Sequence, residues 1–164
     1  MGGIFIKKII ILTILILGLL FLIDVFTLKN QYGGGNGNLS LVFIIPLIPL
    51  LFWYSVALYK LITKTCLKKL NSKFFFLLAI LVVLFGTVYQ YWRYIKIKRD
   101  IRELLIEREL LLDEQYIESI TSGLTSYTNT IFFGYIPFIM LIAFVYILAM
   151  LFNMTNKLKS EDVV

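Results

Sequence analysis

Four long apolar blocks constrain the fold of this chain more than any other feature of its sequence. They cover approximately residues 4–28, 39–62, 74–94 and 131–152. A helix needs about 20 mostly apolar residues to cross a hydrocarbon core about 30 Å thick, because each residue adds about 1.5 Å. A segment in lipid must also satisfy its own backbone hydrogen bonds, and no alternation typical of a barrel is visible. The sequence therefore predicts an all-α integral membrane protein, a single domain with a bundle of four transmembrane helices.

The charge of the chain supports a membrane location. It has 16 Lys and Arg against 10 Asp and Glu, a formal net charge of +6. In a soluble protein this excess would suggest nucleic acid as a partner. Here the basic residues flank apolar blocks, where they act as orientation signals and contact anionic headgroups. We therefore expect the lipid bilayer to be a partner, and nucleic acid not to be one.

A lysine-rich stretch from the end of the second block to the start of the third predicts the orientation. Residues 59–73 carry five lysines and no acid: Lys60, Lys64, Lys68, Lys69 and Lys73. The first connection carries one, so the positive-inside rule places the N- and C-termini in the cytoplasm. The basic residues at 93–102 oppose this orientation, because they would lie outside. The abundance of Ile, Phe, Lys and Asn with little Ala suits an AT-rich genome, and we expect a bacterial plasma membrane.

The chain lacks the side chains that most membrane enzymes would need. It contains no histidine and a single cysteine, Cys66. An intrachain disulfide, a CxxC metal site and a Cys–His nucleophile are therefore excluded, together with the commonest zinc and haem ligand. No phosphate-binding glycine loop or hydrolase motif is present. We predict no catalytic, cofactor-binding or metal-binding residues, and no enzymatic activity.

Asp24 and Arg93 lie near the expected outer ends of the first and third blocks. Ionisable residues in membrane segments cost free energy, so each is a candidate for function. An intramembrane ion pair between them is the candidate interaction. The favoured interpretation places both at the interface, with Asp24 beside the polar connection and Arg93 reaching toward the headgroups beside aromatic residues.

The second block contains Pro46 and Pro49, followed by Trp53 in an aromatic run. Proline in a membrane helix leaves a backbone carbonyl without its usual donor. The pattern makes this segment a candidate for a kinked helix that lines a cavity. More often such prolines are tolerated kinks and the aromatic side chains serve packing, and the depth of Trp53 indicates that it packs against another helix.

Residues 95–120 form the one substantial region outside the apolar blocks, and they predict an amphipathic helix between the third and fourth transmembrane helices. The candidate partner surface consists of Ile97, Ile101, Leu104, Leu105, Leu111 and Leu112. These side chains could bind headgroups, pack on a partner's helix, or belong to a stalk that extends the third helix. A solvated helix on the protein's own membrane face is an equal alternative.

These observations predict a small membrane protein that works by protein–protein interaction. It would be an accessory subunit of a membrane complex or an immunity-type protein that neutralises a membrane-acting toxin. The alternative is a pore or transport protein formed by oligomerisation, which could conduct through a hydrophobic gate. A membrane enzyme is the least favoured class.

Overall fold

The computed structural model describes residues 2–27, 38–65, 72–107 and 114–161, and within these ranges the chain forms helices and no strands. The helices are α1 (Gly2–Phe26), α2 (Leu41–Thr65), α3 (Ser72–Glu107), α4 (Glu114–Thr121), α5 (Asn129–Phe132) and α6 (Tyr135–Glu161). Four segments are long and apolar enough to cross a membrane: Ile6–Phe26, Leu41–Lys64, Lys73–Glu107 and Asn129–Thr155. The predictions of an all-helical chain and of four such segments are confirmed.

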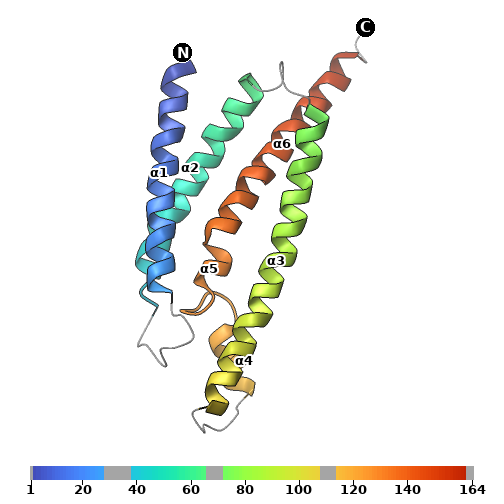
Figure 1. Ribbon diagram of the computed structural model, residues 1–164. Coiled ribbons are helices and arrows are strands. Elements are labelled where there is room, and N and C mark those ends of the chain that lie inside the picture. The colour runs from blue at the N-terminus through green and yellow to red at the C-terminus, as the bar shows by residue number, and fades with distance from the viewer. Residues whose placement is uncertain (1, 28–37, 66–71, 108–113, 162–164) are drawn as a thin grey trace.

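The long helices lie side by side in the order α1, α2, α6, α3 (Figure 1). α1 packs against α2, α2 against α6, and α6 against α3, while the short α5 contacts both α1 and α3. The two termini lie at one end of the molecule, and α4 lies at the other. α1 and α3 are the two outer helices of the row. α5 links them, because it contacts both at the end of the row opposite the termini.

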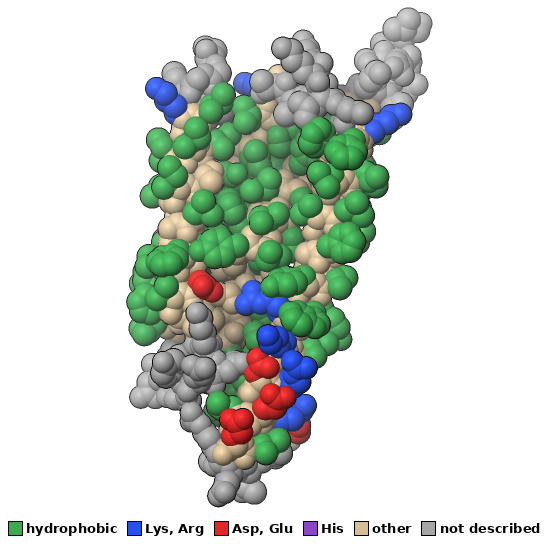
Figure 2. Space-filling model, in the orientation of Figure 1, with side chains coloured by type: hydrophobic (Ala, Val, Ile, Leu, Met, Phe, Trp, Pro, Cys, Tyr) green, Lys and Arg blue, Asp and Glu red, His purple; other side chains and the backbone are tan. Residues whose placement is uncertain are grey.

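The main core lies between α1, α2 and α6. Its buried side chains are Leu12, Ile16, Leu20, Ile23, Ile44, Leu47, Tyr54 and Phe138. The four from α1 recur at intervals of three and four residues and so form one stripe along that helix. The other apolar faces of α1 remain exposed and present a hydrocarbon surface, as Figure 2 shows for one face of the molecule. Helical periodicity thus separates the packed face of α1 from its exposed apolar faces, although nearly every residue of α1 is apolar.

A close approach of α3 and α6 depends on Gly86. A Cβ atom added at this position would lie 2.5 Å from Sδ and 2.6 Å from Cγ of Met140. Real carbon atoms do not approach a sulfur or carbon atom so closely, because the repulsion at that distance exceeds any dispersion attraction. The missing side chain of Gly86 therefore provides the space that Met140 fills.

The fourth apolar block differs from the prediction because it is not one continuous helix over 131–152. α5 ends at Phe132, and α6 begins at Tyr135 and continues to Glu161. A Cβ atom at Gly134 would overlap the backbone carbonyl of Thr130, so the chain turns sharply there. Pro137 follows in the first turn of α6, where its missing N–H costs no intrahelical hydrogen bond. The break positions α5 at the end of the bundle.

The region 95–120 also differs from the expected single amphipathic helix. α3 runs without interruption from the apolar block to Glu107, and its 36 residues span about 54 Å, well beyond the hydrocarbon core. The stalk interpretation therefore describes the first part of this region. A separate helix, α4, then returns alongside α3 (Figure 1). Only this reversal allows the apolar side chains of both segments to be buried against one another.

Candidate functional site

A cavity of about 360 Å³ lies between α1 and α3, near the end of the row that α5 closes. It is lined by Leu20 and Asp24 from α1, Tyr89 and Arg93 from α3, Thr130 from α5, and Gly134, Tyr135 and Ile136 around the start of α6. Figure 2 shows acidic and basic side chains meeting at the border of the broad hydrophobic surface. The cavity combines apolar walls with two ionisable groups of opposite charge.

Helical geometry directs Asp24 into this cavity. Its neighbour Ile23 is fully buried in the core between α1 and α2. Successive side chains of a helix are rotated by about 100°, so Asp24 projects sideways from that packed stripe. The carboxylate is half-buried, and among the described residues no side chain donates a hydrogen bond to it. Asp24 is thus a partly buried anion with no described partner.

Arg93 reaches the same cavity from α3 and is held by α5. Its Nη2 donates a hydrogen bond to Oγ1 of Thr130 at 3.0 Å. The salt bridges among the described residues do not include one between Asp24 and Arg93. The structure therefore brings the two residues to one cavity and gives Arg93 a neutral partner. The direct ion pair stays a prediction.

Paired amides join Asn38, just before α2, to Asn129 at the start of α5, and sequence analysis did not identify them. Nδ2 of Asn38 donates to Oδ1 of Asn129 at 2.9 Å, and Nδ2 of Asn129 donates back to Oδ1 of Asn38 at 2.6 Å. Asn129 is fully buried, so this reciprocal pair satisfies groups that would otherwise cost free energy. Asn129 follows a run of Thr and Ser residues in the sequence. This density of polar residues was the available signal, but it does not indicate which residue faces inward.

Gln90 is a further buried polar group near the cavity. Both the nitrogen and the oxygen of its side chain are buried without a hydrogen-bond partner among the described residues. It lies one turn before Arg93 on α3, although it does not line the cavity itself. Buried amides without partners are rare in folded proteins. The part of α3 around Gln90 therefore has hydrogen-bonding groups that no described residue satisfies.

The predicted partner surface at 95–120 is used largely within the chain. Ile101, Leu105 and Ile117 form a small core between α3 and α4, and Ile97 packs against it. Leu104 is half-buried, and Leu111 and Leu112 lie outside the described residues. Because α4 covers Ile101 and Leu105, which are 3% and 9% exposed, they offer no free surface to a partner.

Ion pairs support the α3–α4 hairpin, which we define as residues 95–107 together with α4. Arg102 donates from Nε to Oε1 of Glu114 at 3.0 Å and from Nη2 to Oε2 at 2.8 Å. Lys98 pairs with Glu118. The guanidinium of Arg102 holds the pKa of the Glu114 carboxyl below its ordinary value, because the hydrogen bonds favour the ionised form. The hairpin is thus held by a small apolar core with charges at its surface.

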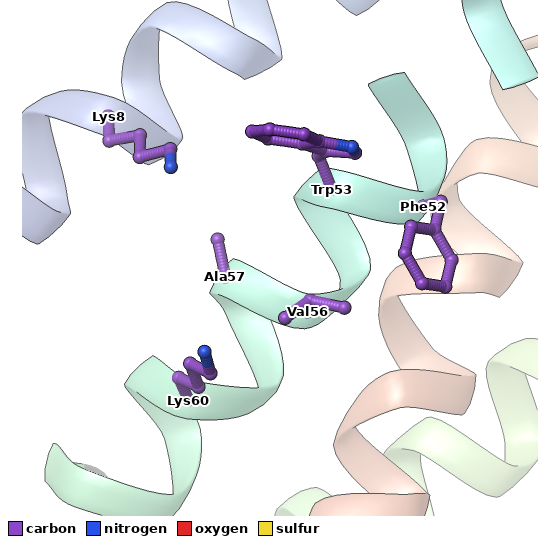
Figure 3. A pocket seen from close by; sticks show the side chains of 6 residues that line it. All are labelled: Lys8, Phe52, Trp53, Val56, Ala57 and Lys60. Atoms are coloured by element: carbon purple, nitrogen blue, oxygen red, sulfur yellow. The ribbon is translucent and has the colours of Figure 1, made fainter. Parts of the chain in front are cut away.

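Trp53 lines a second cavity, whereas Pro46 and Pro49 are not among the residues that line either cavity. α2 continues as a helix through both prolines. The second cavity measures about 260 Å³ and lies between Lys8 of α1 and one side of α2 (Figure 3). Trp53 is 61% exposed rather than deeply packed, and Nζ of Lys8 lies 5.4 Å from the centroid of its ring.

Comparison of the chain with models of protein families, with curated proteins and with solved structures gives no match. The geometry of the two cavities and of the hairpin therefore carries the functional argument.

Proposed function

We propose that this protein acts by contact with another protein in the membrane, as an accessory subunit of a membrane complex or as an immunity-type protein. The partner would insert a polar group of a transmembrane segment into the cavity between α1 and α3. The observation that carries this proposal is Asp24, a half-buried carboxylate on a wall of that cavity with no donor among the described residues. A partner that donates a hydrogen bond to Asp24 would lower the cost of holding a charge there.

The rest of the cavity supports a protein segment as the occupant. Leu20, Tyr89 and Ile136 supply apolar contact area, while Asp24 and Arg93 supply an acceptor and donors. A side chain such as Ser, Thr, Asn or Gln both donates and accepts, so it could bridge the two charges.

The proposed setting is a bacterial plasma membrane with both termini in the cytoplasm. The lysines of residues 60–73 support the cytoplasmic location of both termini through the positive-inside rule. The α3–α4 hairpin would then face the outside, where its charged surface offers a second contact area for a partner.

Photo-crosslinking from α3 tests the proposal. Benzoylphenylalanine is placed at Tyr89, which lines the cavity, and in a matched variant at Val88, which is exposed on α3 but does not line it. In native membranes we expect one protein adduct of defined mass from position 89, severalfold weaker after Asp24→Asn, and mainly lipid adducts from position 88. Equal protein adducts from both positions, or an adduct indifferent to Asp24→Asn, would contradict the proposed site.

The second candidate function is an oligomeric pore, and the same unpartnered Asp24 favours it, because a carboxylate can attract cations into a path. Ion leak from liposomes containing the purified protein separates the two candidates. Tight liposomes support a partner-binding protein. A leak read by a potential-sensitive dye and altered by Asp24→Asn would instead make the pore the better proposal.

A further inference from the structure

The cavity between α1 and α2 differs in character from the one beside Asp24. It is lined by Lys8 of α1 and by Phe52, Trp53, Val56, Ala57 and Lys60 of α2. Figure 3 shows the Lys8 side chain directed toward Trp53, with Ala57 between the two lysines. Trp53, Ala57 and Lys60 follow one another at intervals of four and three residues, so they share one face of α2. The cavity therefore has two cationic groups and an aromatic wall.

The two lysines have no counter-charge among the described residues. Neither Lys8 nor Lys60 takes part in any of the described salt bridges. Apart from Asp24, the acids whose side chains are described lie in the α3–α4 hairpin, at the other end of the molecule (Figures 1 and 2). An anion in the cavity would lower the repulsion between the two ammonium groups. The electrostatics therefore select a negatively charged ligand.

The apolar wall of the cavity and its position along the membrane segments favour an amphiphilic ligand. Phe52 is 68% exposed and Trp53 61%, so both present wide apolar surface beside the lysines. Lys8 lies near the start of the first membrane segment, Ile6–Phe26, and Lys60 near the end of the second, Leu41–Lys64. Lysines near the ends of such segments reach the headgroup level, whereas Phe52 and Trp53 lie near the middle of Leu41–Lys64, at the depth of the acyl chains. A free anion would use the lysines but leave the aromatic wall uncovered.

We propose that this cavity binds the headgroup of one anionic phospholipid. The phosphate lies between the ammonium groups of Lys8 and Lys60, and an acyl chain covers Trp53 and Phe52. A zwitterionic lipid binds less well, because its own ammonium group meets the two lysines. The site is independent of the partner-binding cavity, since the two share no residue.

Fluorescence of Trp53 provides a direct readout. The chain has two tryptophans, so Trp92→Phe leaves Trp53 as the single reporter. This variant is reconstituted in phosphatidylcholine vesicles that contain a small fraction of brominated phosphatidylglycerol or, separately, of brominated phosphatidylcholine. We expect stronger quenching by the brominated phosphatidylglycerol, reversed by its unlabelled form. Each of Lys8→Gln and Lys60→Gln should weaken this preference about fivefold, the factor that corresponds to about 1 kcal/mol for one lysine near a lipid surface.

Matched variants separate a defined site from general surface charge. Lys7→Gln removes the same charge from a neighbouring exposed residue that does not line the cavity, and Lys8→Arg keeps the charge. Both should retain the preference, and Lys8→Arg shows that substitution at this position leaves the fold intact. A loss in Lys7→Gln as large as in Lys8→Gln would overturn the proposal. Displacement of the brominated lipid by inorganic phosphate would also overturn it, because the site would then prefer a free anion.

Discussion

Asp24 and Arg93 reach one cavity from the two helices at opposite ends of the row. Arg93 is partnered by Thr130, whereas Asp24 has no described partner. Each charge nevertheless lies in the field of the other, because both line the same cavity. Interactions of this kind are measured best by a double-mutant cycle, which separates pairwise coupling from the effect of each substitution.

At the residue scale we expect the charges of Asp24 and Arg93 to be coupled. Either reversal, Asp24→Arg or Arg93→Asp, puts two like charges on the cavity and should lower the free energy of unfolding. The double swap restores opposite charges, and the Thr130 hydroxyl can then donate to the carboxylate on α3. The expected coupling is about 0.5 to 3 kcal/mol, measured by unfolding in mixed detergent micelles. A double swap no more stable than the worse single variant would remove the pair from consideration.

At the scale of elements, the contact between α3 and α6 depends on a missing side chain. Gly86→Leu would force its side chain into Met140, and overpacking of this kind costs about 1–3 kcal/mol. Gly18→Leu is the matched control, because a Cβ atom there meets no atom within 4 Å. We expect it to leave the free energy of unfolding unchanged or to raise it, since leucine favours a helix more than glycine does. Similar losses in both variants would show that the α3–α6 approach is less close than described.

The α3–α4 hairpin should respond to pH through Glu114. Its pKa is lower in the folded chain than in the unfolded chain, because Arg102 donates two hydrogen bonds to the carboxylate. The contact therefore stabilises the hairpin above the ordinary carboxyl pKa of about 4.3 and is lost as the pH falls through the lowered folded value. Hydrogen-exchange protection of the α4 amides, corrected for intrinsic rates, should fall in that acidic range. The loss should be a few-fold at most, because the pair is exposed.

Glu114→Gln provides the control for the hairpin. This variant cannot titrate at the position, so its α4 protection should already be reduced at neutral pH and should change less on acidification. The apolar core of Ile101, Leu105 and Ile117 keeps α4 folded back in both proteins. An unchanged pH response in Glu114→Gln would assign the response to another group.

At the scale of the whole molecule, both termini lie at one end and the hairpin at the other (Figure 1). Cysteine labelling tests which end is cytoplasmic, in a Cys66→Ser background. With the proposed orientation, a membrane-impermeant maleimide should label Ser119→Cys in intact cells and Lys7→Cys only after permeabilisation. Both positions are exposed, so burial does not decide the result. The reverse pattern would refute the cytoplasmic assignment of the termini and leave the fold unchanged.

Hydropathy along the chain is enough to predict four helices long and apolar enough to span a membrane. Hydropathy summed over about 20 neighbouring residues is a local property, and the lipid environment requires each such segment to be helical. The same local information placed Asp24 and Arg93 near the same end of the first and third apolar blocks. It could also have located the break near Gly134 and Pro137, where glycine and proline together signal the end of a helix.

The identity of neighbouring helices, and of the side chains that share a cavity, follows from tertiary packing. Asn38 and Asn129 pair although 91 positions separate them, and Lys8 meets Trp53 across the α1–α2 contact. The sequence suggested Ile101 and Leu105 as a surface for a partner, but α4 packs against α3 and buries them. These arrangements depend on which packing of whole helices buries most surface and satisfies most polar groups. The free energy of this packing arises from contacts between segments far apart in the sequence. A local pattern of residues therefore does not predict it.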